Sequence, residues 1–204
     1  MKLLFIGPQG TGKGTYAKII SKELNIPHIS TGDLLRNASG ELGEELKVQM
    51  NSGNLISDEL VIRLLQQRIS EPDCKKGFIL DGTPRNINQV NLLKKIMQID
   101  KVIELTLSDE LAIKRISGRV FCENCKESYN LITEPKPKNP NLCDICQGRL
   151  IQRADDNPNA IKKRLEIYHK ETEPILKEYK NILIQINSNQ NIDNAVKNIL
   201  KELR

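Results

Sequence analysis

The chain of 204 residues is predicted to fold as an α/β protein with a doubly wound, five-stranded parallel sheet. Three observations predict this class. Short apolar segments alternate with longer segments in which apolar residues recur at helical spacing. Most of the short segments are continuously apolar, as expected for strands buried on both faces of a parallel sheet. The first of them leads into a glycine-rich stretch and then a predicted helix, an order typical of phosphate-binding loops.

Strands are expected at residues 2–7, 27–30, 77–82, 101–107 and 182–187. Helices are expected at residues 13–24, 57–69, 108–116, 157–179 and 191–203. The second and third helices begin with Ser-Asp-Glu, which supplies an N-cap and acidic residues for the first turn. The fourth has Asn157 as its cap and Pro158 at its first position, and Pro174 is expected to interrupt it.

The overall composition narrows the function only slightly. The net charge is +5, which suits anionic ligands but fits an ordinary solvated surface equally well. Aromatic residues make up 3% of the chain and no dense basic stripe occurs, so a nucleic-acid partner is not expected. No apolar run reaches the length of a membrane span, and the apolar start MKLLFIG is too short for a signal peptide. We expect a monomeric cytoplasmic protein without a membrane partner.

The stretch GPQGTGKGT, residues 7–15, is predicted to bind the phosphates of a nucleoside triphosphate. Its glycines allow backbone N–H groups to turn inward, where they and the following helix N-terminus surround phosphate oxygens. Lys13 supplies a positive charge to the β- and γ-phosphates. Gly14 occupies the usual Ser/Thr position, so Thr15 is the expected hydroxyl for Mg²⁺. A plain turn is the alternative, but it would not require this combination of residues.

Further along the chain, the segments STGDLLR, LDGTPRNINQ and QRADDNP supply a set of arginines and carboxylates. Arginine binds phosphate oxygens in pairs, and phosphoryl transfer mainly requires two polyanions held in line. For any single arginine, including Arg115, a solvated ion pair is the alternative. Asp81 ends a predicted strand at the ligand-binding edge of the sheet, where it could hold a Mg²⁺-bound water or cap a helix. His28 and His169 are expected to be lone structural or surface residues, so no general base is predicted.

Four cysteines, Cys122, Cys125, Cys143 and Cys146, form two C-x2-C pairs separated by seventeen residues. This spacing is typical of a tetrahedral structural zinc site, and a redox pair is the less favoured alternative. Zinc would contribute on the order of 10 kcal/mol to folding a block with little core of its own. We expect the metal to make residues 118–156 move as one rigid body. Cys74 has no partner motif and is expected to be a buried thiol.

The motifs GPQGTGKGT, HISTGDLLR, GFILDGTPR and QRADDNP, in this order and spacing, resemble those of adenylate kinases of the long bacterial type over essentially the whole chain. The resemblance implies phosphoryl transfer from MgATP to AMP, giving two ADP, with a structural Zn²⁺ in a lid that closes over ATP. It implies catalytic roles for Lys13, Arg85, Arg119, Arg153 and Arg164. It implies ATP-binding roles for Gly10, Thr11, Gly12, Lys13, Gly14, Thr15, Arg119, Ser128, Tyr129 and Gln190. It implies AMP-binding roles for Thr31, Arg36, Asn54, Leu55, Ile56, Gly82, Thr83, Pro84, Arg85, Gln89, Arg153 and Arg164. The implied domains are a core (1–29, 57–117, 157–204), an AMP-binding insertion (30–56) and a lid (118–156).

Two positions depart from the family pattern: Gln9 stands where many members have Pro, and Thr83 stands where they usually have Phe. Loss of an aromatic ring beside the AMP site is expected to loosen packing there. A kinase for another acceptor, such as GMP, UMP, CMP or a small alcohol, is the first rival interpretation, because the preference for adenine comes mainly from the resemblance. A nucleotide-switched nucleic-acid binder with a zinc ribbon is the second, and the low aromatic content speaks against it.

Overall fold

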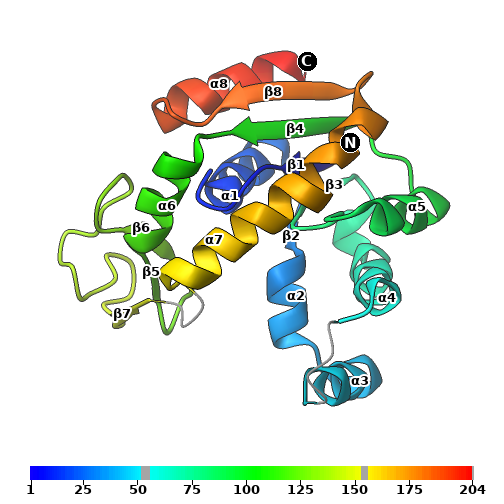
Figure 1. Cartoon of the computed structure of the whole chain (residues 1–204), viewed down its shortest axis with the longest axis horizontal. Helices are drawn as coiled ribbons and strands as arrows, with labels where there is room; N and C mark the ends of the chain where they lie inside the picture. Colours follow the sequence, from blue (N-terminus) through cyan, green and yellow to red (C-terminus); the bar gives the residue numbers. More distant parts are fainter. Residues whose placement is uncertain (52–55, 153–155, 204) are drawn as a thin grey trace.

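The computed structural model describes residues 1–51, 56–152 and 156–203, with the side chains of 47–51 left aside. Its centre is a five-stranded parallel sheet in the order β2-β3-β1-β4-β8 (Figure 1). The strands are β1 (Lys2–Ile6), β2 (His28–Ser30), β3 (Phe78–Asp81), β4 (Lys101–Thr106) and β8 (Leu183–Asn187). The predicted fold class and all five predicted strands are confirmed.

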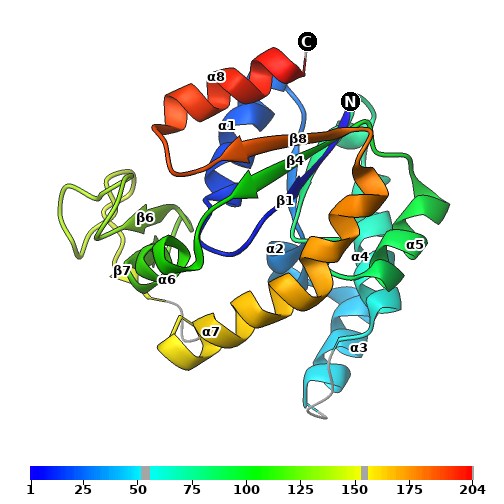
Figure 2. The same cartoon turned by 45° about the horizontal axis from the view of Figure 1, so that its top comes forward.

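Both faces of the sheet are covered, which explains why the strands are continuously apolar. In β1, Leu3 and Phe5 pack against α1 (Lys13–Leu24) and α8 (Ile192–Glu202), while Leu4 and Ile6 belong to the core of the opposite face. That second core is closed by α4 (Asp58–Ile69), α5 (Ile87–Ile96) and the helical segment that begins with α7 (Pro158–Ile167) (Figures 1 and 2). Alternate residues of one strand therefore serve two different cores.

The predicted helix starts agree with observed caps. The Ser57 hydroxyl accepts the Leu60 N–H at 3.3 Å where α4 begins. The Ser108 hydroxyl accepts the Leu111 N–H at 3.4 Å at the start of α6 (Asp109–Ser117). Each serine thus satisfies a backbone donor that the first helical turn leaves unpaired.

The predicted interruption near Pro174 is also confirmed. Helix α7 (Pro158–Ile167) continues as one π-helical turn, η2 (Tyr168–Thr172), and then as the 3₁₀ segment η3 (Glu173–Tyr179). Proline cannot donate an i to i−4 hydrogen bond, so regular α-helix does not pass through this point. At the end of the wider turn, the Thr172 hydroxyl donates to the Arg85 carbonyl at 2.7 Å.

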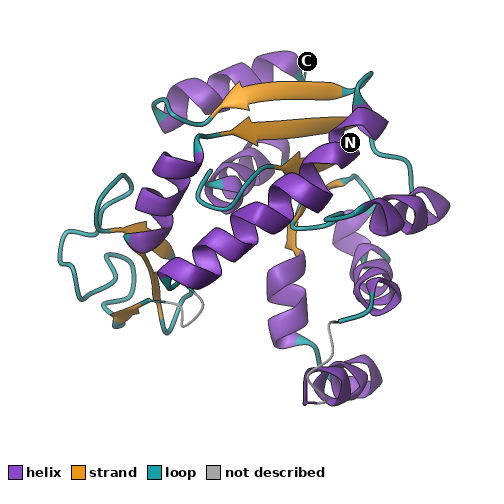
Figure 3. Cartoon of the chain, in the orientation of Figure 1, coloured by secondary structure: helices purple, strands orange, loops and turns teal. Residues whose placement is uncertain are grey.

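Two further parts extend from the sheet, as Figure 3 shows by secondary structure. Helices α2 (Thr31–Asn37) and α3 (Gly40–Asn51) form an arm that leads away from β2 (Figure 1). The cysteine-rich block forms a three-stranded antiparallel sheet of β5 (Arg119–Cys122), β6 (Ser128–Asn130) and β7 (Leu150–Ile151). The sequence patterns predicted neither these strands nor α2, α3 and α5. Among the described residues, no helix is long and apolar enough to cross a membrane.

Candidate functional site

The loop between β1 and α1 adopts a backbone that depends on glycine. Gly10 and Gly12 have φ angles of +89° and +85°, which L-residues with a side chain rarely adopt. A Cβ built on Gly10 would lie 2.8 Å from the Ala112 carbonyl oxygen, so this turn also packs closely against α6. The loop ends at the N-terminus of α1, where unpaired N–H groups favour an anion.

Lys13 lies across this loop. Its ammonium donates to the carbonyl oxygens of Gly7 at 2.6 Å and Pro8 at 2.9 Å. Desolvation lowers the pKa of Lys13 to about 8; the negative charge of Asp81 opposes the shift, and the positive charges of Arg85 and Arg119 add to it. An anion in the loop would relieve this repulsion.

A buried carboxylate gathers two of the predicted arginines. Asp156, whose side chain is fully buried, accepts from Arg119 Nε at 2.9 Å and from Arg119 Nη2 at 2.6 Å. Arg164 Nη2 donates to the same carboxylate at 2.9 Å. Burial opposes ionisation of Asp156, but hydrogen bonds and charge from both arginines outweigh it and hold its pKa below the ordinary range. Arg153, the third predicted arginine of this region, lies outside the described residues, as does Asp155.

A second group lies at the carboxyl end of β3. A Cβ built on Gly82 would lie 3.6 Å from Arg85 Nη2 and 3.7 Å from the Thr31 Cβ, so these three predicted residues are neighbours. The Thr31 hydroxyl is buried and has no hydrogen-bond partner within the described part of the chain. Desolvation lowers the pKa of Arg85, and the nearby charges of Arg164 and Arg36 lower it further, against attraction by Asp81.

The main chain of Arg85 is held on both sides. Its N–H donates to Gln89 Oε1 at 2.8 Å, and its carbonyl accepts the Thr172 hydroxyl. Its Nε donates to the Gly82 carbonyl at 2.8 Å. These contacts place the guanidinium without using all of its donors, so donors remain for an anion.

The remaining residues expected to bind phosphate or AMP have varied contacts. Arg36 forms an exposed ion pair with Asp33 at 2.6 Å. Arg115 donates to the Ser188 carbonyl at 3.0 Å, which ties α6 to the end of β8. Ile56 packs on the small core of the α2–α3 arm. Thr83 and Pro84 are buried, and the peptide bond between them is cis. Asn54 and Leu55 lie outside the described residues.

Besides Arg119, three residues were expected to contact ATP outside the loop. The Tyr129 hydroxyl lies 3.5 Å from Cys143 Sγ and accepts the Asp144 N–H at 3.1 Å, so this side chain faces the cysteine cluster. Gln190 donates to the Asn187 carbonyl at 2.6 Å, and Ser128 is half-buried at the start of β6. Their roles toward ATP stay predictions.

His169 is a surface residue as predicted, but the expectation that both histidines are lone is wrong. His28 Nε2 lies 3.6 Å from Asp81 Oδ2, because β2 pairs with β3 in a register that sets His28 opposite Ile79, two residues before Asp81. His169 lies between two carboxylates, with Nε2 at 3.0 Å from Asp109 and Nδ1 at 2.6 Å from Glu173. The contact with Glu173 follows helical spacing, because the two residues are four positions apart, whereas the contacts with Asp81 and Asp109 join distant segments.

One of the expected Mg²⁺ ligands, Asp81, lies beside the start of α1. A Cβ built on Gly14 would lie 3.7 Å from Asp81 Oδ2, so position 14 is adjacent to this carboxylate. The chain has no hydroxyl at position 14, and the role of Thr15 stays a prediction.

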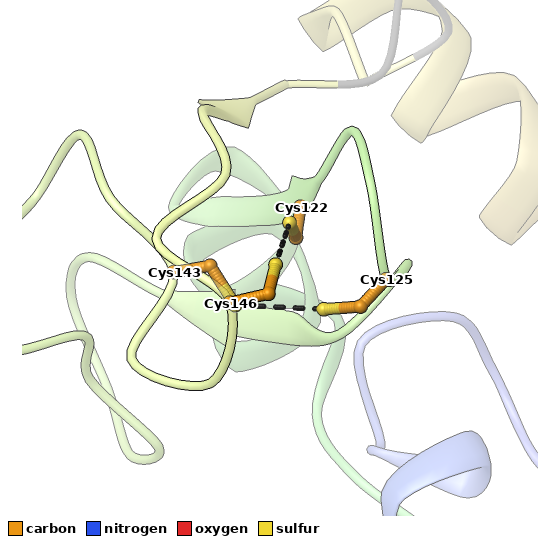
Figure 4. Close-up of side chains that lie close together, drawn as sticks. All are labelled: Cys122, Cys125, Cys143 and Cys146. Carbon is orange, nitrogen blue, oxygen red and sulfur yellow. Dashed lines mark hydrogen bonds between the residues drawn. The ribbon is translucent and has the colours of Figure 1, made fainter.

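The four paired cysteines converge in the small antiparallel domain (Figure 4). Their sulfur atoms all lie within 4.8 Å of one another, with Cys122 and Cys146 3.4 Å apart and Cys125 and Cys143 3.5 Å apart. Four sulfurs around one zinc ion would be separated by about 3.8 Å, so the cluster fits a tetrahedral ion. Burial raises the pKa of Cys143, but hydrogen bonds from Tyr129 and backbone N–H groups outweigh it and lower the value to about 6, which favours a thiolate ligand.

Cys74 is buried as predicted, but it is not without polar contacts. Arg68 Nη1 lies 3.0 Å from its sulfur, and Arg68 also pairs with Asp73. Burial raises the pKa of Cys74, so the thiol form is favoured and the residue is structural.

Comparison with known proteins identifies the relatives of this chain. The family model described as adenylate kinase matches residues 5–184. An adenylate kinase of Methanocella arvoryzae is 44% identical over 214 aligned positions, covering 100% of this chain and 99% of that protein. One of Caldicellulosiruptor bescii is 43% identical with the same coverage, and one of Treponema denticola is 47% identical over 92% of both chains.

Proposed function

This chain belongs to the adenylate kinase family and catalyses reversible phosphoryl transfer from MgATP to AMP, giving two ADP, and from that premise we propose how its residues carry out the reaction. Lys13, Arg85, Arg119, Arg153 and Arg164 hold the two phosphate groups in line and stabilise the charge of the transferred group.

The mutual repulsion of Lys13 and the described arginines carries the proposal. The pKa of Lys13 is lowered, after desolvation, by Arg85 and Arg119, and that of Arg85 by Arg164 and Arg36. Cationic side chains from five separate segments of the chain therefore lie close together: Lys13, Arg36, Arg85, Arg119 and Arg164. The carboxylates of Asp81 and Asp156 attract members of this group. A site of this kind is complementary to a polyanion.

The chemistry needs no general base. An oxygen of the AMP phosphate attacks the γ-phosphorus of ATP, the bond from that phosphorus to the β–γ bridging oxygen breaks, and ADP leaves with the bond's electron pair. The attacking oxygen is already an anion, so no proton must be removed. The His28–Asp81 pair is therefore not required as a base.

For the acceptor, we assign the AMP site to the region around Thr31, whose buried hydroxyl lacks a protein partner in the described chain. The other members are Arg36, Asn54, Leu55, Ile56, Gly82, Thr83, Pro84, Arg85, Gln89, Arg153 and Arg164. For the donor, we assign the ATP site to Gly10, Thr11, Gly12, Lys13, Gly14, Thr15, Arg119, Ser128, Tyr129 and Gln190. Asp81 and Thr15 would hold Mg²⁺ or its waters, and the ion would neutralise phosphate charge.

We also propose that the cysteine cluster holds a structural zinc ion, because four thiolates leave no open coordination position. Residues 118–156 would then act as a lid that excludes water from the phosphoryl group. Residues 30–56 form the AMP-binding insertion, and 1–29, 57–117 and 157–204 form the core. We further propose a cytoplasmic monomer without nucleic-acid or membrane partners, as the composition indicates.

The test combines acceptor preference with one matched pair of variants. Purified protein is given MgATP with AMP, GMP, UMP or CMP, and nucleotides are separated by chromatography. We expect ADP formation that depends on AMP and little ATP loss without an acceptor. Arg85→Lys should lower kcat by about 10²-fold or more, because lysine cannot bind phosphate oxygens in pairs.

Arg63→Lys is the control, since Arg63 forms a surface pair with Glu45 and is 52% exposed. Equal activity of the two variants would overturn the role of Arg85. ATP loss that does not depend on an acceptor would contradict exclusion of water by the lid.

A further inference from the structure

The carboxylate of Asp58 accepts hydrogen bonds from three amide side chains. It lies at the first position of α4 and accepts from Asn86 Nδ2 at 3.1 and 3.2 Å, from Asn88 Nδ2 at 2.8 Å and from Gln89 Nε2 at 2.6 Å. The donors come from the start of α5, about thirty residues further along the chain. The catalytic roles proposed above do not use Asp58.

The amide of Gln89 is held at both ends. Its Nε2 donates to Asp58, and its Oε1 accepts the Arg85 N–H at 2.8 Å. A carboxylate only accepts hydrogen bonds and a backbone N–H only donates them, so each contact sets the same orientation of the amide. Turning the amide by 180° would break both hydrogen bonds and place like groups together in a buried position, since Gln89 is only 6% exposed.

The proposed function places Gln89 in the AMP site, and we take its amide to face the base of the acceptor there. Each end of the amide keeps one unused group, a lone pair on Oε1 and an N–H on Nε2. Adenine offers an amino donor at position 6 beside the acceptor N1, which matches that pair. Hypoxanthine reverses both groups, with an oxygen at position 6 and an N–H at N1. A freely turning amide could adapt to either base.

We propose that Asp58 is a positioning residue for base selection: together with the Arg85 N–H it prevents Gln89 from turning, and so makes the site prefer AMP over a 6-oxopurine monophosphate. Discrimination here comes from an unfavourable pairing with the wrong base as much as from a good pairing with the right one. A well-formed two-bond contact to a base edge discriminates by roughly 5- to 150-fold. The inference rests on the proposed AMP site, and its test separates the two.

The experiment measures kcat/KM for AMP and for IMP with saturating MgATP. IMP is the probe because it reverses the edge of the base without adding the second amino group of GMP. Asp58→Ala should lower the AMP-to-IMP ratio by about fivefold or more, within the range of such contacts. Glu59→Ala is the matched control, because Glu59 is an exposed acidic residue in the same first turn of α4, and it should leave the ratio unchanged.

Gln89→Leu distinguishes failure of the proposal from failure of the site. If this variant keeps the wild-type ratio, Gln89 does not read the base, and both the site assignment and the inference are overturned. If Gln89→Leu lowers the ratio but Asp58→Ala retains it, only the role of Asp58 is overturned. A general structural defect would lower both kcat/KM values together without changing their ratio, and that result also counts against the inference.

The wild-type protein supplies a second measurement if Asp58→Ala does not fold. Side-chain ¹⁵N–¹H spectra should show restricted rotation and slow solvent exchange for the Gln89 amide. Exposed glutamines such as Gln66 and Gln67 on α4 provide the comparison. An amide of Gln89 that rotates and exchanges like theirs would overturn the proposal.

Discussion

Replacing Asp156 with Asn should destabilise the protein far more than breaking a surface ion pair. The Asp156 side chain is fully buried and accepts two hydrogen bonds from Arg119 and one from Arg164. Removing one member of a buried pair typically costs about 3–5 kcal/mol. The two arginine side chains are 25% and 20% exposed, so part of their charge can return to water. We therefore expect a loss of about 2–3 kcal/mol in the free energy of unfolding.

Thermal melting measures this loss. For a chain of this size, the expected destabilisation corresponds to a fall in Tm of about 5–10 °C. Glu45→Gln is the control: its bridge to Arg63 is 2.8 Å long but 40–52% exposed, and should contribute less than about 1 kcal/mol. Equal, small shifts in Tm for the two variants at neutral pH would refute the reasoning.

The pH dependence provides an independent check. The pKa of Asp156 is depressed in the folded protein, so its stabilisation is present above the unfolded value of about 3.9. It is lost only as the pH falls through the lower folded pKa. The difference in Tm between wild type and Asp156→Asn should therefore persist at neutral pH and shrink in acid.

Three further predictions follow from the phosphate loop and the lid. The pKa of Lys13 is about 8 and bound phosphates favour its cationic form, so the affinity for MgATP should fall about tenfold between about pH 7 and pH 9 in titration calorimetry. Lys13→Arg should abolish this pH dependence. Equal wild-type affinity at both pH values would contradict the prediction. Extraction of zinc with a chelator should lower Tm more than it lowers activity at low temperature, with metal content measured in parallel, and an unchanged Tm would argue against a structural ion. Gly10→Ala should lower Tm more than Gly12→Ala, because the nearest atom to a built Cβ is 2.8 Å away at Gly10 but 3.5 Å away at Gly12. A larger fall in Tm for Gly12→Ala would contradict the packing argument.

Local patterns in the sequence account for the features that depend on neighbouring residues. Ser57 and Ser108 cap the helices that their motifs predict. The C-x2-C spacing indicates a metal site, but the contacts of Cys122 with Cys146 and of Cys125 with Cys143 join the two motifs and depend on how the small domain folds. The predicted strands agree because apolar runs of this length are buried on both faces.

Most contacts that sequence reasoning missed join distant segments, although the pair of His169 with Glu173 was missed despite its helical spacing. Asp58 meets Gln89 only because α4 packs beside α5, and His28 meets Asp81 only through the register of β2 on β3. The arginine motif pointed to Asp156, but the side chain's complete burial depends on the packing of several elements. Spacing along the chain contains no signal for such pairings.

The ion pair between Arg119 and Asp156 affects which parts of the cysteine-rich block can change in sequence and length. The chain passes into the cysteine-rich block at Arg119 and is back at the core by Asp156, so the two ends of the block are clasped at a narrow neck. The block beyond this neck has its own small core around Val120, Tyr129 and Leu150. We therefore expect it to behave as an exchangeable cassette, whose outer loops tolerate changes of length while the two residues of the neck, the small core and the four cysteines are kept.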